Sequence, residues 1–508
     1  MPTGVYPTIT AALADWGCRT PDAVALTDGD VELRHGDLLA RVEAAAGRLV
    51  ALGARKGDRV IVVGDNTWQW VVAYLAILRI GAIAVPMNNR LAVAQVRSLV
   101  QVLESRIALA DANHLGLFDD CSDLAVFAIT GDAGRRFDDL PTAPGALPAP
   151  PDPHDDALIS FTSGTTGVPK GAVITHEAYR RACEVYVELI DASPASSTLI
   201  VAPLFHNTGF VDQLGTMLLG GGRSDLILRY RTQDAVAACR RRPTTFVTAV
   251  PSVLRLMMTA EGADAIYGPA RDVLFGGSPM PAPWSLEMNQ RWPALRLWHG
   301  YGLTEFTSCC TLLPAELIQS HGESIGVAAR GVELRLVDEV GDDVPDGEIG
   351  EIWVAGATRM REYWRQPALT AEKLSGRWLR TGDLARRDGR GLVYHVGRRD
   401  DVINRGGEKI LPAFVEAILA EVPEISQAVV FAVPHPVLQS SVLAAAEPRP
   451  GMTVDVDRVT AFLRGRLPGY AMPEAILVSD DLPRTASGKL DRRAVRAAWL
   501  VAHPQTNP

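Results

Sequence analysis

Residues 162–171 read Thr-Ser-Gly-Thr-Thr-Gly-Val-Pro-Lys-Gly, and they decide how the rest of the chain is interpreted. This stretch holds four hydroxyl side chains, three glycines and one lysine within ten positions. Glycines let backbone N–H groups curve around an anion, because they adopt positive φ without strain. Lys170 adds a compact positive charge, and it is one of only five lysines among 50 basic residues. The stretch therefore predicts a loop suited to phosphate.

The residues around the loop exclude the P-loop of nucleoside triphosphatases. That loop has the pattern G-x-x-x-x-G-K-[ST] between a strand and a helix. Here Lys170 follows Pro169 and precedes Gly171, so the magnesium-binding hydroxyl residue is missing. Residues 157–161 predict a strand before the loop, and residues 172–175 predict a second strand after it. On spacing alone, a plain turn between two strands also stays open.

Strands alternate with helices over much of the chain, which favours an α/β fold class. Residues 59–63 predict a strand, residues 68–80 a helix, and residues 83–85 another strand. Such alternation is typical of layered α/β sheets with parallel strands. We expect a large N-terminal domain over residues 1–399 and a smaller, mobile α+β C-terminal domain over residues 400–508. From Val332 the large domain changes to short strands between Asp/Gly turns, which predicts a small β-rich subdomain.

Composition excludes several classes of protein. A net charge of −9 over 508 residues gives no broad attraction for nucleic acid. The first ten residues lack a basic segment and a long apolar run, so no signal peptide is expected. The most apolar stretch, residues 70–86, carries Arg79 and Gly81, which predicts a buried helix and strand rather than a membrane span. The six cysteines form no C-x-x-C pair, which indicates free thiols and a cytoplasmic protein.

Further motifs follow the opening loop in a fixed order. They are Gly276-Gly277-Ser278-Pro279-Met280, Gly300-Tyr301-Gly302-Leu303-Thr304-Glu305, Thr381-Gly382-Asp383, Gly397-Arg398-Arg399-Asp400-Asp401 and Pro483-Arg484-Thr485-Ala486-Ser487-Gly488-Lys489. With residues 162–171, this set resembles the motifs of the adenylate-forming superfamily, which includes acyl-CoA synthetases, peptide-synthetase adenylation domains and firefly luciferase. The resemblance covers essentially the whole chain. It departs at Glu362, where a glycine is usual, but this position lies outside the chemical motifs.

The resemblance implies that ATP and Mg²⁺ activate a carboxylate as an acyl-adenylate. A carboxylate attacking the α-phosphorus brings two anions together, so the site needs well-placed donors and cations. Glu305 resembles the magnesium ligand, and Thr304 the donor to the α-phosphate. The residues implied at the β- and γ-phosphates are Thr162, Ser163, Gly164, Thr165, Thr166 and Lys170. The residues implied at adenine are Tyr301, Gly276, Gly277 and Ser278.

The resemblance also implies residues for the ribose and for the change between two reaction steps. Asp383 has two carboxylate oxygens that can accept from both ribose hydroxyls, with Arg398 as its neighbour. Lys489 resembles the lysine that bridges the attacking carboxylate and the nucleotide. Because a thiol must enter afterwards, we expect the small domain to swing about a hinge at Asp400. The paired glycines Gly406 and Gly407 would then let the pantetheine arm of coenzyme A pass.

Residues 203–209 resemble the segment that borders the acid pocket. Amino-acid-activating relatives carry an aspartate near this point, whereas this chain has His206, and Asp212 lies off the pattern. An amino-acid substrate is therefore not expected. His206 is open between a steric gate and a proton-transfer group. The residues expected to line a pocket for an aryl, alicyclic or fatty acid are Phe205, His206, Phe210, Val250 and Trp298, and some of these would be ordinary core residues.

Three classes of function stay open on the sequence. An acid–CoA ligase is favoured by the complete set of motifs. The alternative is an acyl-AMP ligase that loads an acyl carrier protein, or an enzyme specialised for one half-reaction. A non-catalytic nucleotide-binding protein is disfavoured, because Lys170, Glu305, Asp383 and Lys489 are all present. The identity of the acid and the oligomeric state, a homodimer included, are not readable from the sequence.

Overall fold

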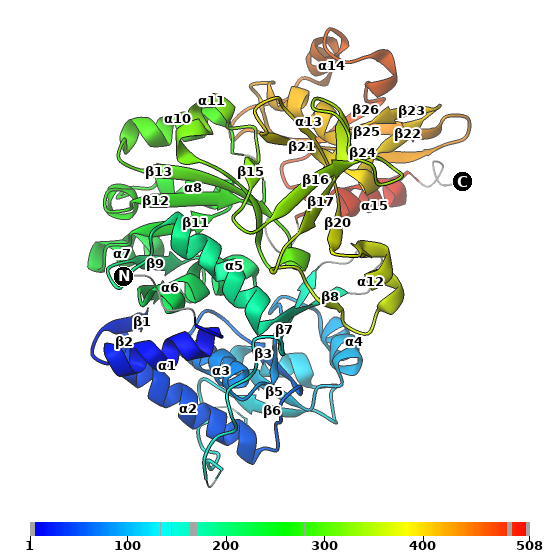
Figure 1. Ribbon diagram of the computed structural model, residues 1–508. Coiled ribbons are helices and arrows are strands. Elements are labelled where there is room, and N and C mark those ends of the chain that lie inside the picture. Colours follow the sequence, from blue (N-terminus) through cyan, green and yellow to red (C-terminus); the bar gives the residue numbers. More distant parts are fainter. Residues whose placement is uncertain are drawn as a thin grey trace. The chain divides into compact units, whose positions relative to one another are not determined.

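The computed structural model describes residues 6–132, 134–143, 145–162, 170–278, 280–484 and 490–503. Of Thr162, only the backbone is described. The chain forms two compact units, and Figure 1 labels the helices and strands. Unit 1 comprises Met1–Leu334 and Trp353–Arg380, and unit 2 comprises Arg335–Ile352 and Thr381–Pro508. Unit 2 thus includes residues 381–399 as well as the expected small domain, and the expected division after Arg399 stays a prediction.

The first sheet of unit 1 has seven strands in the order β18-β8-β7-β4-β3-β5-β6. Strands β7, β4, β3, β5 and β6 run parallel, whereas β8 and β18 are added antiparallel at one edge. The strand bounds are β3 Arg59–Val63, β4 Ile83–Pro86, β5 Ile107–Ala110, β6 Ala125–Ala128, β7 Asp156–Thr162, β8 Lys170–Thr175 and β18 Glu362–Tyr363. The strands expected on either side of the opening loop are confirmed.

The second sheet of unit 1 has nine strands in the order β15-β14-β13-β12-β11-β9-β10-β1-β2. Its central strands are parallel, and β2, β14 and β15 are antiparallel at the edges. The strand bounds are β1 Val24–Asp28, β2 Val31–Arg34, β9 Ser197–Ile200, β10 Arg223–Leu226, β11 Phe246–Ala249, β12 Asp272–Gly276, β13 Arg296–Gly302, β14 Cys309–Leu313 and β15 Val327–Ala328. The expected layered α/β fold is therefore confirmed.

Helices cover these sheets and connect their strands. The longer helices are α1 Ile9–Arg19, α2 His35–Ala51, α3 Trp68–Arg79, α4 Val93–Leu103, α5 His176–Leu189, α7 Thr232–Arg241, α8 Pro251–Thr259 and α10 Ala282–Arg291. The shorter elements are η1 Ala112–Phe118, the π-helix η2 Thr208–Gly215, α6 Thr216–Gly220, α9 Asp264–Tyr267, η3 Thr304–Phe306, η4 Ala315–Leu317, α11 Ile318–His321 and α12 Pro367–Lys373. Helix α3 confirms the helix expected over residues 68–80.

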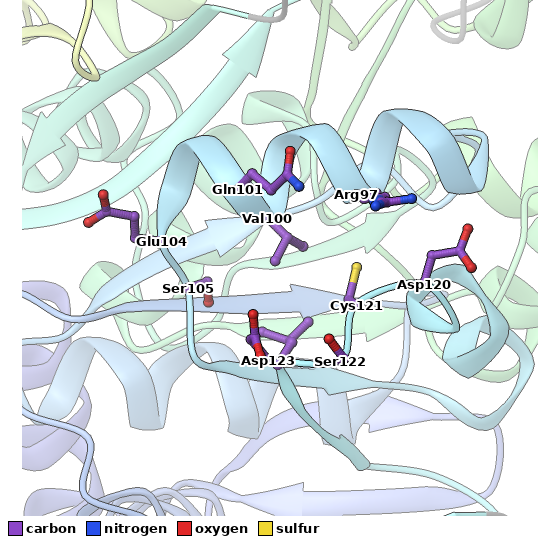
Figure 2. Close-up of a pocket in the computed structure, with 10 residues that line it drawn as sticks. Arg97, Val100, Gln101, Glu104, Ser105, Asp120, Cys121, Ser122 and Asp123 are labelled. Atoms are coloured by element: carbon purple, nitrogen blue, oxygen red, sulfur yellow. The ribbon is translucent and has the colours of Figure 1, made fainter.

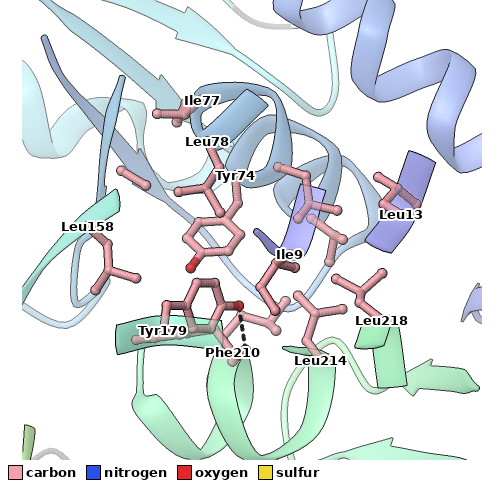
Figure 3. Packing of buried hydrophobic residues seen from close by; sticks show 14 of the residues in the cluster. Ile9, Leu13, Tyr74, Ile77, Leu78, Leu158, Tyr179, Phe210, Leu214 and Leu218 are labelled. Carbon is pink, nitrogen blue, oxygen red and sulfur yellow. Dashed lines mark hydrogen bonds between the residues drawn. The ribbon is translucent and has the colours of Figure 1, made fainter. Parts of the chain in front are cut away.

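The core of unit 1 is built around α3 and a group of aromatic side chains. The α3 residues 70–78 are all buried, because this helix is apolar on every side. Tyr74 lies against Tyr179 of α5 and Phe210 of η2, and the hydroxyl of Tyr179 donates to the carbonyl of Phe210 at 2.7 Å (Figure 3). Each large side chain buried in this way contributes about 1.5–3 kcal/mol of hydrophobic stabilisation.

Short strands follow residue 332, as expected for a β-rich segment. They form a sheet of order β16-β17-β20-β19, in which β21 pairs with β20. The bounds are β16 Glu333–Val337, β17 Ile349–Ala355, β19 Leu374–Ser375, β20 Trp378–Arg387 and β21 Val393–Arg398.

The remainder of unit 2 is an α+β structure with its own core. The strands are β22 Ile403–Arg405, β23 Glu408–Ile410, β24 Ile425–His435, β25 Gln439–Pro448 and β26 Ala475–Val478. The helical segments are η5 Arg399–Asp401, α13 Pro412–Ala420, α14 Val456–Arg464, η6 Gly469–Ala471 and α15 Arg492–Ala502. Apolar residues of α13, α14 and the β24–β25 pair close one core, which includes Val415, Val430, Val442 and Leu463.

Candidate functional site

The opening loop joins two antiparallel strands of unit 1. Strands β7 and β8 pair along their length, and their last pair joins Thr162 to Lys170 across the base of the loop. Ser163, Gly164, Thr165 and Thr166 lie outside the described residues. A P-loop would lead into a helix directly after its lysine. Here Lys170 begins a strand instead, so the loop is not a P-loop, as the sequence predicted.

The motif at residues 300–305 forms a tight turn between β13 and β14. Thr304 and Glu305 lie in the short helix η3 and are half-buried, as is Tyr301 at the end of β13. The turn requires a glycine at 302, because a Cβ there would lie 1.8 Å from the carbonyl oxygen of Ser308. The close packing at Gly302 therefore restricts the backbone conformation of the turn that carries Thr304 and Glu305.

Two neighbours fix Glu305 within this turn. The hydroxyl of Tyr363 donates to Oε1 of Glu305 at 2.7 Å, and the backbone N–H of Met360 donates to its carbonyl oxygen at 2.8 Å. Tyr363 itself is buried, with 1% of its surface exposed. The sequence analysis did not identify Tyr363. It lies 58 residues from Glu305, and no local sequence pattern predicts a contact over that separation.

The Gly276–Ser278 motif lies beside this turn. Strand β12 ends at Gly276, which pairs with Gly300 of the parallel strand β13. Gly277 follows with φ of +78°, and Ser278 is half-buried. Ligands of open α/β sheets bind at the carboxyl ends of adjacent parallel strands. The structure therefore brings together two of the expected nucleotide motifs, residues 276–278 and 301–305.

The residues expected around the acid lie in different surroundings within unit 1. Phe205 is 6% exposed and its ring centroid lies 4.5 Å from that of His206. Phe210 is fully buried in the aromatic core of Figure 3. Val250 is the half-buried residue preceding α8, and Trp298 donates from Nε1 to Oδ1 of Asp272 at 2.9 Å. Their roles at an acid pocket stay predictions.

In unit 2, the Thr-Gly-Asp and Gly-Arg-Arg motifs meet across two paired strands. Asp383 of β20 is the direct partner of Arg398 of β21. Oδ1 of Asp383 lies 3.1 Å from Nε of Arg398 and 3.5 Å from Nε2 of His395. The Asp383 side chain is 4% exposed, whereas that of Arg398 is 60% exposed. The buried carboxylate of Asp383 is thus paired with the accessible guanidinium of Arg398. The sequence analysis did not identify His395 as a neighbour of Asp383.

Glu351 supports the segment of β20 that carries Asp383. Its Oε1 accepts from the backbone N–H of Gly382 at 2.9 Å, and its Oε2 lies 3.1 Å from Nη1 of Arg399. The hydroxyl of Thr381 accepts from the N–H of Asp383 at 3.0 Å and donates to the carbonyl of Ile352 at 2.7 Å. The Thr-Gly-Asp segment of β20 is therefore held at three successive residues.

The remaining expected residues of unit 2 lie in turns or outside the described residues. Asp400 is exposed within η5. Gly406 and Gly407 form the turn between β22 and β23, with φ of +57° and +94°. Lys489 lies outside the described residues.

A pocket of about 300 Å³ lies elsewhere in unit 1 (Figure 2). It is formed by α4 and by the residues that precede β6, and Figure 2 shows Arg97, Gln101, Cys121 and Asp123 around it. Its lining includes none of the residues expected at the nucleotide or the acid. Burial raises the pKa of the Cys121 thiol, so this cysteine is not activated as a nucleophile.

One group of side chains in the described part of the chain has metal-like composition: Asp65, Asp111 and His114. Their atoms already bind protein partners. Oδ2 of Asp65 lies 2.9 Å from Nε of Arg229, and Oδ2 of Asp111 accepts from the backbone N–H of Asp65 at 2.8 Å. Nδ1 of His114 lies 2.5 Å from Oδ1 of Asp111. The cluster therefore ties loops together, and Glu305 is the better candidate for Mg²⁺.

Among the described residues, no helix has both the length and the apolar character needed to cross a bilayer.

Sequence comparisons cover both units. Residues 13–364 match the family described as AMP-binding enzyme, and residues 415–489 match the AMP-binding enzyme C-terminal domain. A feruloyl-CoA synthase of an Amycolatopsis species is 32% identical, over 95% of this chain and 98% of its own length. An indoleacetate–CoA ligase of Aromatoleum aromaticum is 29% identical, over 95% and 97%.

A solved structure is similar over nearly the whole chain. It is the o-succinylbenzoate CoA synthetase of Bacillus subtilis in complex with its acyl-adenylate intermediate, with a TM-score of 0.85 and 26% identity. The match covers 95% of this chain and 97% of that chain. The same synthetase has also been solved with ATP and a magnesium ion, with a TM-score of 0.84.

Proposed function

The chain belongs to the AMP-binding enzyme family of adenylate-forming enzymes, and from this premise we propose that it is an ATP-dependent acid–CoA ligase. In the first step, a carboxylate oxygen attacks the α-phosphorus of ATP, which gives an acyl-adenylate and pyrophosphate. In the second step, the thiol of coenzyme A attacks the acyl carbon, which gives a thioester, AMP and a proton. ATP, Mg²⁺ and coenzyme A are therefore the small molecules required.

The observation that carries this proposal is the pairing of Gly276 with Gly300. This pairing puts residues 276–278 next to residues 301–305, so the residues that we propose for adenine and for Mg²⁺ lie on neighbouring strand ends. The donor set fits the metal, because the Glu305 carboxylate is a hard oxygen ligand. When bound, Mg²⁺ would neutralise charge that develops on the phosphate oxygens.

The residues of the chain act by binding and orientation. Tyr363 holds the Glu305 carboxylate in place through its hydroxyl at 2.7 Å. Thr304 would donate to the α-phosphate, and Lys170 with the loop after Thr162 would bind the β- and γ-phosphates. Asp383 would accept from the ribose hydroxyls beside Arg398, while Lys489 would bridge the attacking carboxylate and the nucleotide.

We place the substrate in the class of hydrophobic carboxylic acids, with aryl acids first to be tested. Feruloyl-CoA synthase, indoleacetate–CoA ligase and o-succinylbenzoate CoA synthetase are each named for an acid that carries an aromatic ring. The apolar residues Phe205, Val250 and Trp298 support the same class. His206 remains our candidate for a residue that contacts the acid.

We also propose a cytoplasmic location with coenzyme A as the acceptor. The buried thiols of Cys183, Cys239 and Cys309 suit a reducing compartment. An acyl carrier protein as the acceptor is the alternative. The swing of residues 400–508 about Asp400, with Gly406 and Gly407 along the thiol path, belongs to this proposal.

One experiment tests the proposal in two stages. A panel of carboxylic acids is incubated with ATP and Mg²⁺ without coenzyme A, and acid-dependent pyrophosphate release and hydroxamate trapping are measured. The best acid is then given with coenzyme A, with an acyl carrier protein, or as synthetic acyl-adenylate. Thioester with free coenzyme A is expected. Absence of pyrophosphate release with every acid would contradict adenylation, and thioester on the carrier alone would favour the alternative.

A further inference from the structure

The π-helix η2 has two faces with different partners. Its apolar face enters the aromatic core, where Phe210 and Leu214 lie near Tyr74 and Tyr179 (Figure 3). Two polar residues have other partners: Asn207, which directly precedes the helix, and Asp212, which lies within it. A π-helix is rare, occurs mostly as a single turn, and frequently lies at a functional site.

The π geometry explains why these two polar side chains act together. In an α-helix, residues five apart point about 140° away from each other around the axis. In η2 the backbone N–H of Thr216 bonds to the carbonyl of Val211, five residues earlier, which is the wider turn of a π-helix. Residues 207 and 212, also five apart, are thereby brought toward one side of the segment.

Asn207 and Asp212 bind two consecutive residues of the turn that carries Glu305. The side-chain amide of Asn207 donates to the carbonyl of Thr307, and its oxygen accepts from Ser160 of β7 at 3.2 Å. Oδ1 of Asp212 accepts from the hydroxyl of Ser308 at 2.6 Å. A serine hydroxyl has one proton to donate. Tyr186 of α5, 2.6 Å away, must therefore be the donor to Ser308.

The turn needs such support, because Thr307 has an unfavourable backbone conformation. Its φ is +63°, which a β-branched residue rarely adopts and which costs about 1–3 kcal/mol. Its hydroxyl donates to the carbonyl of Thr358 at 2.6 Å, so Thr307 is held on both its side chain and its carbonyl. Thr304 and Glu305 lie three and two residues before this point.

We propose that Asn207 and Asp212 are positioning residues, which hold the Thr304–Glu305 turn in the geometry needed for adenylation. This proposal rests on the proposed function of the turn. Asn207 also follows His206 directly, so the same contact joins the acid segment to the turn that would bind Mg²⁺ and the α-phosphate. A change at either residue would displace donors without removing any group that touches a substrate.

The test compares Asn207→Ala and Asp212→Ala with the matched control Gln213→Met. Gln213 lies on the same helix and is fully buried, but its amide donates to Leu199 and Thr198 of β9 rather than to the turn. Hydrogen–deuterium exchange of peptides spanning residues 303–308 needs no substrate. Faster exchange is expected in both test variants and unchanged exchange in the control. Unchanged exchange in all three would overturn the proposal.

Enzyme kinetics then distinguishes a role in positioning the turn from a role in the stability of the fold alone. Pyrophosphate release should show kcat lowered about 10- to 100-fold in the test variants, with KM for the acid nearly unchanged and more Mg²⁺ needed for half-saturation. Loosened exchange with wild-type kcat and Mg²⁺ dependence would also overturn the proposal. If Asn207→Ala does not fold, Ser308→Ala removes the partner of Asp212 and serves in its place. Wild-type protein that releases no pyrophosphate would contradict the proposed function, while the exchange result would still decide whether the contacts hold the turn.

Discussion

Asp383 and Arg398 pair directly across β20 and β21, and Nε of Arg398 lies 3.1 Å from Oδ1 of Asp383. The two residues come from motifs 15 positions apart in the chain, and the strand register brings them together. The carboxylate is buried and the guanidinium is exposed, so the pair presents a charged edge while the acceptor stays fixed. This arrangement suits a diol that must be bound in one orientation.

The first prediction concerns this acceptor. Asp383→Asn keeps the side-chain size but removes the charge, and KM for ATP should rise about 10- to 100-fold, because hydrogen bonds to charged groups contribute about 1.5–3 kcal/mol. The rise should be smaller with 2′-deoxy-ATP, which lacks one of the hydroxyls. Pyrophosphate release with both nucleotides measures this. Arg387→Ala is the control, because Arg387 lies on β20 like Asp383 and the change removes only its exposed ion pair with Asp346. Equal rises with both nucleotides would speak against ribose binding by Asp383.

The second prediction concerns Tyr363 and Glu305. Tyr363→Phe removes the hydroxyl that lies 2.7 Å from Oε1 of Glu305, so the carboxylate loses one orienting contact. We expect about a 3- to 10-fold higher Mg²⁺ requirement and a stability loss of about 1 kcal/mol. Tyr267→Phe is the control, since its buried hydroxyl donates to the carbonyl of Leu254 at 2.9 Å. If both variants shift the Mg²⁺ titration equally, Tyr363 has no particular role at Glu305.

Local patterns predicted the elements of this fold well. The strand expected over residues 59–63 is observed as Arg59–Val63, and the strands around the opening loop are β7 and β8. These predictions succeed because hydrophobic period and turn residues act over a few neighbours. The expected nucleotide motifs came from the family resemblance, and the register of β12 with β13 shows why two of them are neighbours.

The contacts that support the motifs could not be predicted from the sequence. Asn207 and Thr307 are 100 residues apart, and such pairing leaves no periodic trace in either segment. Thr307 at positive φ runs against the preference of a β-branched residue, so tertiary contacts override local propensity there. The π-helix η2 was equally hidden, since residues 208–215 have no signal that distinguishes a π turn from an α turn.

The third prediction concerns His176 at the start of α5. Burial lowers the pKa of its imidazole from 6.5 to about 4, and its Nε2 has no hydrogen-bond partner among the described residues. Between these values the unfolded chain binds a proton that the folded protein does not, so this group makes stability fall as pH falls from about 6.5 to 4. The loss approaches about 3 kcal/mol at the acid end. Relative to the wild type, His176→Phe should therefore gain stability as pH falls from about 6.5 to 4, as measured by urea unfolding of both proteins from pH 4 to 8. His154→Gln, at an exposed site, is the control, and a difference between His176→Phe and the wild type that stays constant with pH would refute the assignment.

The fourth prediction has the opposite sign and concerns Asp212. Burial raises the pKa of its carboxyl from 3.8 to about 7, although the hydroxyl of Ser308 lowers it in part. Between pH 4 and 7 the unfolded chain has released a proton that the folded protein retains, so this group makes stability fall as pH rises. Asp212→Asn should therefore gain stability relative to the wild type from pH 4 to pH 8, by up to about 4 kcal/mol. Because His176 and Asp212 act in opposite directions, the wild-type profile is flatter than that of either variant. A difference between variant and wild type that stays constant with pH would show that Asp212 is ionised throughout this range.

The fifth prediction separates the two half-reactions through Lys489. If this lysine bridges the carboxylate and the nucleotide only during adenylation, Lys489→Ala should lower pyrophosphate release about 100- to 1,000-fold, since one well-placed donor contributes that much. Thioester formation from supplied acyl-adenylate and coenzyme A should continue near the wild-type rate, because the second step needs a thiol path and not the lysine. Lys373→Ala, at the end of α12, removes a lysine from a position with no assigned role and should change neither rate. Equal loss of both half-reactions in Lys489→Ala would mean that the residue supports the folded site as a whole, and the swing about Asp400 would lose its main argument.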